Sequence, residues 1–237
     1  MIIKNKKKQF AFVIPVYNHA GTVAQVVKDA QDLGFPVFVV DDGSTDNTYD
    51  AIKDIADIQI LRHPQNQGKG AAILTGFAAA SAVADWAITI DADGQHYPQD
   101  ANKLIQAIPK NSRPIIVGAR AGMEGKHIPW TSSFGRKFSN FWVRTSGCPK
   151  ISDSQSGFRI YPLPEALNLK TKARRFQFEV EILVHAHRSG IPVIESPIRV
   201  HYNPEGGRIS HFRPFVDFCR NSSTFTRLIF RRIFFLK

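Results

Sequence analysis

The stretch Trp86-Ala-Ile-Thr-Ile-Asp-Ala-Asp-Gly-Gln-His96 joins a hydrophobic run to two carboxylates, and the rest of the chain is arranged around it. Residues 86–90 are apolar or β-branched and predict a buried strand. Asp91 and Asp93 follow with one residue between them, so in extended chain both side chains point the same way. Gly94 then lets the chain turn. Two hard oxygen donors suit Mg²⁺ or Mn²⁺, although an acidic turn with solvated carboxylates would show the same residues.

Strands and helices alternate on both sides of this stretch. Apolar runs predict strands at 10–15, 37–41, 58–62, 86–90, 114–118 and 192–202. Helical spacing is found at 22–34 and 98–108, in a short helix through Ile52 and Ile55, and in an alanine-rich helix that follows Gly70. Two further helices are expected to start at Phe178 and Phe215. Thr22 is expected to cap the first of these helices. The alternation predicts an α/β fold with a mostly parallel central sheet and helices on both faces.

Polar side chains follow several of these strands at the point where each strand ends. They are Tyr17, Asn18, Asp41, Asp42, Asp91, Asp93 and Arg120. Each is compatible with ordinary turn chemistry. A parallel topology, however, would bring all of them to one crevice at the carboxyl ends of the strands.

A nucleotide is the ligand that this crevice suggests. Asp42 is expected to hydrogen-bond a base or ribose, and residues 66–70 to let the backbone approach a nucleotide. Lys69 either adds positive charge near phosphates or is a solvated loop lysine. The Gly-Lys-Gly at 68–70 lacks the spacing of a P-loop, and no Gly-x-Gly-x-x-Gly follows the first strand, which counts against a dinucleotide cofactor.

Length and charge set the broad class. The 237 residues suffice for one large α/β domain or two small ones, and the net charge of +11 favours phosphate-bearing partners: nucleotides, nucleic acid or anionic lipid. The two cysteines form neither a metal-ligand spacing nor a disulfide framework, as expected in a reducing compartment. No apolar run approaches the roughly 18 residues of a spanning helix.

Six short motifs occur in an order that resembles family 2 glycosyltransferases with a GT-A fold. They are Pro15-Val-Tyr-Asn18, Val39-Val-Asp-Asp-Gly-Ser44, Asn66-x-Gly-Lys-Gly70, Asp91-Ala-Asp-Gly-Gln-His96, Val117-Gly-Ala-Arg120 and Asp153-x-x-Ser-Gly-Phe-Arg159. The resemblance is to the branch of dolichol-phosphate mannose synthase-like and bacterial polyprenyl-phosphate enzymes, and it covers roughly residues 10 to 212.

The resemblance implies a role for each matching position. Pro15, Tyr17 and Asp42, with Asn18 beside them, would hold the nucleoside; Asp91, Asp93 and Gln95 the metal; Arg120 and Arg136 the phosphates; and Asp153 would be an acceptor-side carboxylate. Near the end of the chain members often carry a Gly-x-Ser-Lys segment, and here Arg208 is expected to contact phosphate instead. Many members have a carboxylate where His19 stands, which leaves the donor base open.

The implied chemistry has two forms. Breaking a sugar–diphosphate bond leaves negative charge on the nucleotide, which a divalent ion and guanidinium groups stabilise. A hydroxyl acceptor would need a general base, for which Asp153 is the candidate, with a turn cap as the alternative. A lipid-phosphate acceptor is already anionic and needs arginines to position it.

Four further side chains are interpreted with alternatives. Arg159 is expected to be structural or to pair with a carboxylate. Of Glu179 and Glu181, two apart on one helix, one is expected to face the acceptor pocket and the other to be solvated. His96 is either a neighbour of the metal or a satisfied loop histidine.

The C-terminal segment, residues 213–237, predicts a basic amphipathic helix. Arg220, Arg227 and Arg231 share one face, and Phe225, Ile229, Ile233 and Leu236 lie on roughly the opposite one. Such a helix is typical of a membrane surface, and the alternative is a helix packed on the domain.

The sequence thus predicts a GT-A domain over 1–212 and a membrane-surface helix over 213–237. We expect a metal-dependent, inverting glycosyltransferase that moves a sugar from a UDP- or GDP-linked donor to a polyprenyl-phosphate-like acceptor. Its expected place is the cytoplasmic, inner face of the membrane, without a nucleic-acid partner. The alternatives are the same fold with a soluble or saccharide acceptor, a sugar nucleotidyltransferase, and a basic nucleic-acid-binding protein.

Overall fold

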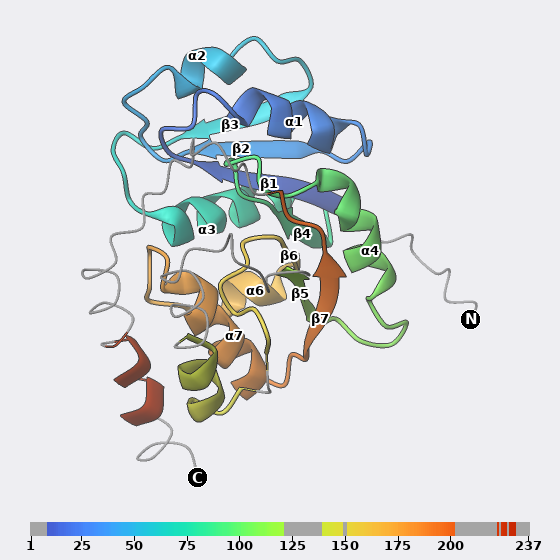
Figure 1. Cartoon of the computed structure of the whole chain (residues 1–237), viewed down its shortest axis with the longest axis vertical. Coiled ribbons are helices and arrows are strands. Elements are labelled where there is room, and N and C mark those ends of the chain that lie inside the picture. Colours follow the sequence, from blue (N-terminus) through green and yellow to red (C-terminus); the bar gives the residue numbers. More distant parts are fainter. Residues whose placement is uncertain are drawn as a thin grey trace.

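The central feature of the computed structural model is a mixed sheet covered by helices on both faces (Figure 1). The structure describes residues 9–120, 139–148, 151–201, 222, 224–226 and 228–230. Within these residues the strands are β1 (Phe10–Val16), β2 (Val37–Asp41), β3 (Ile58–Arg62), β4 (Trp86–Thr89), β5 (Ile115–Arg120), β6 (Arg159–Pro162) and β7 (Val193–Ile198). The helices are α1 (Val23–Gln31), α2 (Thr48–Ile52), α3 (Lys69–Ala80), the 3₁₀ turn η1 (Pro98–Asp100), α4 (Ala101–Gln106), α6 (Glu165–Asn168) and α7 (Phe178–Arg188).

The strand order is β3-β2-β1-β4-β6-β5-β7. All described pairs are parallel except those of β6, which runs antiparallel to β4 and β5. The expected α/β fold with a mostly parallel sheet is therefore confirmed. Because β6 is reversed, the segment that precedes it enters the sheet at the edge where the parallel strands end.

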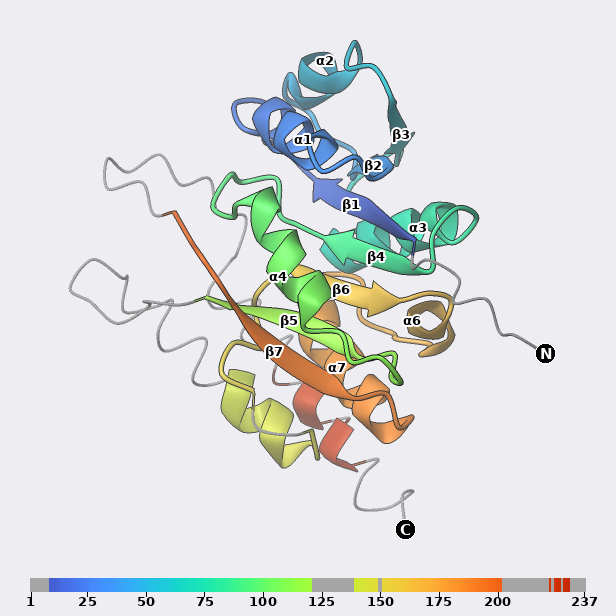
Figure 2. The same cartoon turned by 90° about the vertical axis from the view of Figure 1, so that its right-hand side faces the viewer.

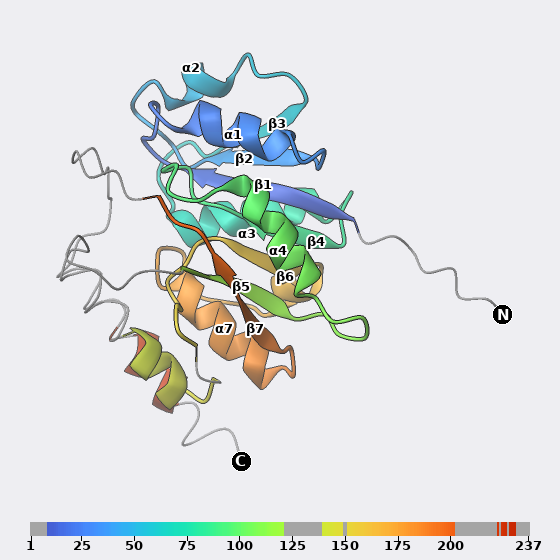
Figure 3. The same ribbon diagram turned by 45° about the vertical axis from the view of Figure 1, so that its right-hand side comes forward.

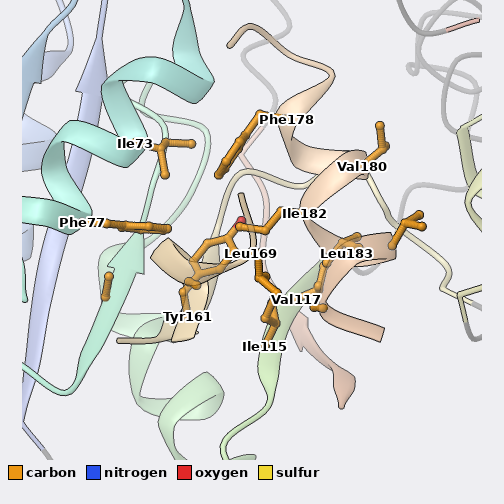
Figure 4. Packing of buried hydrophobic residues seen from close by; sticks show 14 of the residues in the cluster. Ile73, Phe77, Ile115, Val117, Tyr161, Leu169, Phe178, Val180, Ile182 and Leu183 are labelled. Atoms are coloured by element: carbon orange, nitrogen blue, oxygen red, sulfur yellow. The ribbon is translucent and has the colours of Figure 1, made fainter. Parts of the chain in front are cut away.

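Two hydrophobic layers hold the helices on the sheet. Helices α1, α2 and α4 pack on one face through residues such as Val27, Ile52 and Leu104, whereas α3, α6 and α7 pack on the other (Figure 2). Figure 4 shows this second layer, where Phe77 of α3 meets Tyr161 of β6 with ring centroids 4.9 Å apart. Burial of such large apolar surfaces fixes α3 and α7 relative to the sheet.

The predicted elements match the observed ones with small differences. Helix α6 and the antiparallel direction of β6 were not predicted, because a four-residue helix and a strand direction leave no periodic signal. Thr22 occupies the N-cap position of α1, but its side chain makes no cap bond. Its hydroxyl instead donates to the carbonyl of Ala92 at 2.6 Å, which ties the start of α1 to the carboxylate loop.

The described part of the C-terminal helix lies against the domain. Phe225 and Leu228 are 1% exposed, Phe225 stacks on Trp142, and Arg188 donates to the carbonyl of Leu228 at 2.8 Å. Phe230 is 52% exposed. The remaining predicted members of the two faces, apart from Ile229, lie outside the described residues. Among the described residues no helix is both long and apolar enough to cross a bilayer.

Candidate functional site

Polar side chains gather at the edge of the sheet where its parallel strands end. The parallel pairs place the ends of β1, β2, β4 and β5 at this edge, and Figure 3 shows β1 and β7 running toward the same side. The reversed β6 brings residues 153–158 to the same edge. Five connections thus meet at the sheet edge where the sequence predicts a crevice, including one that the parallel pattern alone would not supply.

A buried ammonium lies between two carboxylates at the centre of this edge. Lys69 Nζ, at the first residue of α3, lies 2.6 Å from Asp91 Oδ1 and 2.6 Å from Glu179 Oε1 of α7. Burial would lower the pKa of Lys69, but the charges of Asp91 and Glu179 raise it above its usual value. The pKa of Asp91 is lowered by Lys69 against the opposing effect of burial. The alternative of a solvated loop lysine is therefore wrong.

The second carboxylate of the motif is held less tightly. Asp93 Oδ1 accepts a hydrogen bond of 3.0 Å from the backbone N–H of Gln95, whose carbonyl accepts one from His201 at 2.8 Å. Burial and the neighbouring charge of Asp91 raise the pKa of Asp93 above its usual value. A cation bound beside Asp93 would offset the charge of Asp91 and favour the ionised form of Asp93.

Gly157 backs directly onto the Asp91 carboxylate. A Cβ atom at this position would lie 2.6 Å from Cγ of Asp91, closer than packed carbon atoms approach. The carbonyl of Gly157 accepts a 2.8 Å hydrogen bond from the hydroxyl of Thr89 on β4. The glycine of the Ser-Gly-Phe motif therefore leaves the space that Asp91 occupies.

The donor set fits a hard divalent ion. Among the described residues, no three His, Cys, Asp or Glu side chains come together as a metal site. Mg²⁺ commonly takes only one or two carboxylates from the protein and completes its shell with substrate phosphates and water. Asp91 and Asp93 match that pattern, and Asp91 already binds a cation in the form of Lys69.

His96 is buried close enough to Asp91 and Asp93 to interact with their charges. It is 7% exposed, its ring packs on Phe158 at 5.6 Å between centroids, and its Nδ1 has no hydrogen-bond partner among the described residues. The alternative of a satisfied loop histidine thus does not hold for Nδ1. Burial lowers the pKa of His96, against the charges of Asp91 and Asp93.

Asp42 organises the loop between β3 and α3. Its carboxylate, 2% exposed, accepts hydrogen bonds from the backbone of Gln67 at 2.9 Å and of Gly68 at 2.7 Å, and contacts Nδ1 of His63 at 2.7 Å. These contacts fix the residues just before α3, whose first residue, Lys69, contacts Asp91. A direct contact of Asp42 with a nucleoside stays a prediction.

The residues expected beside the nucleoside on β1 have different surroundings. Pro15 is buried in the strand, and Tyr17 is half-buried at its end. Asn18 joins two loops, because its Oδ1 accepts from the backbone of Thr45 at 2.8 Å and of Asp46 at 3.4 Å. Their roles toward a ligand stay predictions.

Asp153 and Arg120 form a two-pronged ion pair. Arg120 Nε donates to one carboxylate oxygen at 2.6 Å and Nη2 to the other at 2.8 Å, and Asp153 is 1% exposed. Glu195 of β7 fixes the loop that carries Asp153, since its Oε1 accepts from the backbone of Ser152 at 2.8 Å and of Asp153 at 3.1 Å. Asp153 thus holds the guanidinium of Arg120 in place.

Arg159 is structural, as one interpretation expected. It is fully buried and donates to the carbonyls of Ser154 at 2.8 Å, Ser156 at 2.6 Å and Glu179 at 2.7 Å. These bonds connect the Asp153 loop to the start of α7. Arg159 therefore holds the backbone of two site segments together.

The expectation that Glu179 or Glu181 is solvated is wrong. Both are buried, at 5% and 1% exposure. Glu181 Oε2 accepts from the backbone of Lys172 at 3.0 Å and of Ala173 at 2.6 Å, so it anchors the segment before α7. The physical reason is that α7 is covered on both of these faces, one by α3 and the other by its own preceding segment.

Three contributions to the site were not predicted from the sequence, and two predicted site residues are not tested by the structure. The ion pair of Glu179, the loop anchor Glu195 and the close approach of Gly157 depend on tertiary contacts; only the Ser-Gly-Phe motif carried a signal for the glycine. Arg136 and Arg208 lie outside the described residues.

Comparison with known proteins relates the chain to one family of enzymes. A family model described as glycosyl transferase family 2 matches residues 11–165. The UDP-N-acetylglucosamine–dolichyl-phosphate N-acetylglucosaminyltransferase of Methanococcus voltae is 32% identical over 217 residues, which cover 82% of this chain and 86% of that protein. A dolichyl-phosphate beta-glucosyltransferase of Saccharomyces cerevisiae is 30% identical, over 80% of this chain and 66% of that protein.

Among solved structures, the chain resembles glucosyl-3-phosphoglycerate synthase from Mycobacterium tuberculosis in complex with Mg²⁺ and UDP. The TM-score is 0.69 at 18% identity, over 95% of this chain and 79% of that one. This likeness shows a common fold and confirms the predicted GT-A architecture.

Proposed function

This chain belongs to glycosyl transferase family 2, and we propose that it transfers a sugar from a nucleotide diphosphate to a polyprenol-type lipid phosphate. The observation that carries the proposal is the meeting of Asp91 and Asp93 with two cationic side chains, Lys69 and Arg120, at one sheet edge. The charge of Arg120 acts on Asp91 as well as on its own partner. A diphosphate with its divalent ion and an anionic acceptor together need this combination of charges. Membership of the family leaves the nucleotidyltransferase and nucleic-acid-binding alternatives without support.

The donor side of the proposal uses the ends of β1, β2 and β4. Asp91, Asp93 and Gln95 would hold Mg²⁺ or Mn²⁺ on the diphosphate, and the bound ion would offset the charge that develops on the leaving nucleotide. Uridine is the proposed base, because the Methanococcus relative is named for a UDP-linked donor. The loop that Asp42 organises would lie beside the nucleoside.

The acceptor side is inferred from charge and from the relatives. Two relatives whose names specify different sugars are both named for dolichyl phosphate. A phosphate oxygen is already anionic, so it requires a positioned cation rather than a base. Arg120, held by both oxygens of Asp153, is the proposed cation, and a single displacement by the phosphate would invert the anomeric carbon.

The transfer reaction itself tests this proposal. We expect labelled sugar to pass from UDP-N-acetylglucosamine or UDP-glucose to undecaprenyl or dolichyl phosphate when Mn²⁺ is present, and not to the free alcohol of the same lipid. The alcohol is the matched control, since it differs only in the anionic phosphate. Calorimetric titration with UDP and GDP, each with and without Mn²⁺, first establishes the donor base. Transfer to the free alcohol or only to a soluble saccharide would refute the lipid-phosphate assignment.

We also propose that the protein meets the membrane through exposed aromatic side chains. Phe141, 61% exposed, and Phe230, 52% exposed, lie on two helical segments that touch through Trp142 and Phe225. Aromatic side chains are favoured at membrane surfaces, and the net positive charge suits an anionic leaflet. The cytoplasmic face is the proposed side, because the cytoplasm contains nucleotide sugars and is the reducing compartment that the cysteine content favours.

Replacing both phenylalanines with serine should weaken binding to vesicles of anionic phospholipid by at least about 10-fold, since each buried aromatic contributes about 1.5–3 kcal/mol. Co-sedimentation measures the effect. Val83→Ser is the control. Val83 is similarly exposed, at 49%, and lies before the first residue of β4, outside the two helical segments that carry Phe141 and Phe230. Equal binding of the double variant and the wild type would rule out this surface.

A further inference from the structure

Asp91, the proposed metal ligand, already binds a cation that belongs to the chain. We propose that Lys69 occupies Asp91 before the metal arrives, and that Glu179 retains the displaced lysine beside the diphosphate once metal and donor are bound. This inference rests on the proposed function, because it takes Asp91 as a metal ligand. It adds to that function a defined competitor for the metal and a role for Glu179, which no sequence motif indicated.

The geometry makes Lys69 a competitor of the metal. Its ammonium lies 2.6 Å from Asp91 Oδ1, and its side chain is only 15% exposed. A divalent ion bound to the same oxygen would place two more positive charges against the ammonium, with little water to screen them. The lysine must therefore leave Oδ1 of Asp91 before the ion can bind to that oxygen.

Glu179 offers the lysine a second position. Its Oε1 also lies 2.6 Å from Lys69 Nζ, and its side chain is 7% exposed. Arg159 donates to the backbone carbonyl of Glu179 at 2.7 Å, so the start of α7 is fixed from the opposite side. The ammonium can thus be released from Asp91 without losing its counter-charge.

The backbone around Lys69 is held against α7. A Cβ atom at Gly70 would lie 2.5 Å from Cβ of Phe178, and Gly68 has a left-handed φ of 105° that favours glycine. The backbone N–H of Ala71 donates to the carbonyl of Arg174 at 2.9 Å. Displacement of Lys69 therefore requires a change of side-chain rotamer, and the lysine stays at the edge where the diphosphate would lie.

This arrangement has a thermodynamic consequence. Metal alone must break the Lys69–Asp91 ion pair, whereas metal bound with a diphosphate supplies a new anionic partner for the ammonium. Metal and nucleotide should then bind cooperatively, and Lys69 should be the side chain that couples them. Removing the ammonium should strengthen binding of the bare metal and weaken the coupling.

The test is a titration with Mn²⁺ in the absence of nucleotide, followed by the electron paramagnetic resonance signal of free Mn²⁺. Lys69→Met is expected to bind Mn²⁺ at least 10-fold more tightly than the wild type, and Lys69→Arg about as weakly as the wild type. Lys53→Met is the matched control, since Lys53 forms an exposed pair with Asp50. Asp93→Ala supplies the baseline without a metal site. Affinity of Lys69→Met equal to or below that of the wild type would overturn the inference.

Glu179→Gln provides a test of opposite sign, and if Lys69→Met does not fold, an unchanged or higher Mn²⁺ affinity of Glu179→Gln would by itself overturn the inference. With Glu179 neutral, the lysine has only Asp91 as its partner, so Mn²⁺ affinity should fall. In the Lys69→Met background the same change should have little effect. An equal effect in both backgrounds would mean that Glu179 acts on the metal through its charge alone. Glu179 would then not be the residue that retains the displaced lysine.

Adding UDP separates this inference from the proposed function. In the wild type UDP should increase Mn²⁺ affinity, and in Lys69→Met that increase should shrink at least 10-fold. Failure of the wild type to bind Mn²⁺ with or without UDP would reject the metal site and the proposed function together. Normal Mn²⁺ and UDP binding by the wild type, with no gain in Lys69→Met, would reject the lysine inference alone.

Discussion

Alanine at position 157 is expected to weaken metal-dependent UDP binding by about 100-fold while the fold is retained. The added Cβ would lie 2.6 Å from Cγ of Asp91, so the carboxylate has to move. The backbone of Gly157 cannot retreat easily, because its carbonyl accepts the Thr89 hydroxyl at 2.8 Å. A displacement of about 1 Å at a metal ligand is enough to cost two orders of magnitude.

Gly21→Ala is the control for this experiment. A Cβ at Gly21 meets nothing within 4 Å, and no left-handed φ requires glycine there. Calorimetry with UDP and Mn²⁺ measures binding for both variants, and thermal unfolding shows that each is folded. If Gly157→Ala binds UDP and Mn²⁺ as the wild type does, Asp91 is not part of the donor site.

The fold was largely predictable because its signals are local. The apolar runs of β1, β2, β3 and β5 are bounded by Gly, Pro or Asp, and both boundaries of β2 and β3 were placed correctly. The carboxylates after β4 were recognised because strand geometry alone sets their spacing and direction. The direction of β6 could not be predicted, since antiparallel and parallel strands of this length share one hydrophobic pattern.

The site was predictable as a set of residues and not as a set of partners. Lys69 and Glu179 are separated by 110 positions, and nothing local indicates that one ammonium joins two carboxylates. A glutamate such as Glu181 is expected at the surface. Its carboxylate is instead buried and accepts hydrogen bonds from backbone N–H groups of the segment before α7. Such pairings follow from how α7 packs, which depends on the complete sheet.

The pair of Asp153 and Arg120 leads to the second large effect. Asp153→Asn should lower kcat/KM about 100-fold and leave UDP affinity unchanged, because the guanidinium loses its ionic partner, one of its two hydrogen-bond acceptors and its orientation. Glu165→Gln is a matched control, since Glu165 holds Arg113 through both oxygens just after the last residue of β6, whereas the acceptor-side loop precedes its first residue. Thermal unfolding checks both variants, because breaking a buried ion pair also destabilises a protein.

Combining this change with Arg120→Ala distinguishes a positioning role from base catalysis. If Asp153 acts only by holding Arg120, the double variant should be no slower than Arg120→Ala alone, since the aspartate then has nothing to orient. The shape of the pH–rate profile should also be the same in Asp153→Asn and the wild type. A general base would behave differently: its removal would slow the Arg120→Ala enzyme further and eliminate an acidic limb of the profile. That result would favour a hydroxyl acceptor over the lipid phosphate, because only a hydroxyl has a proton to lose.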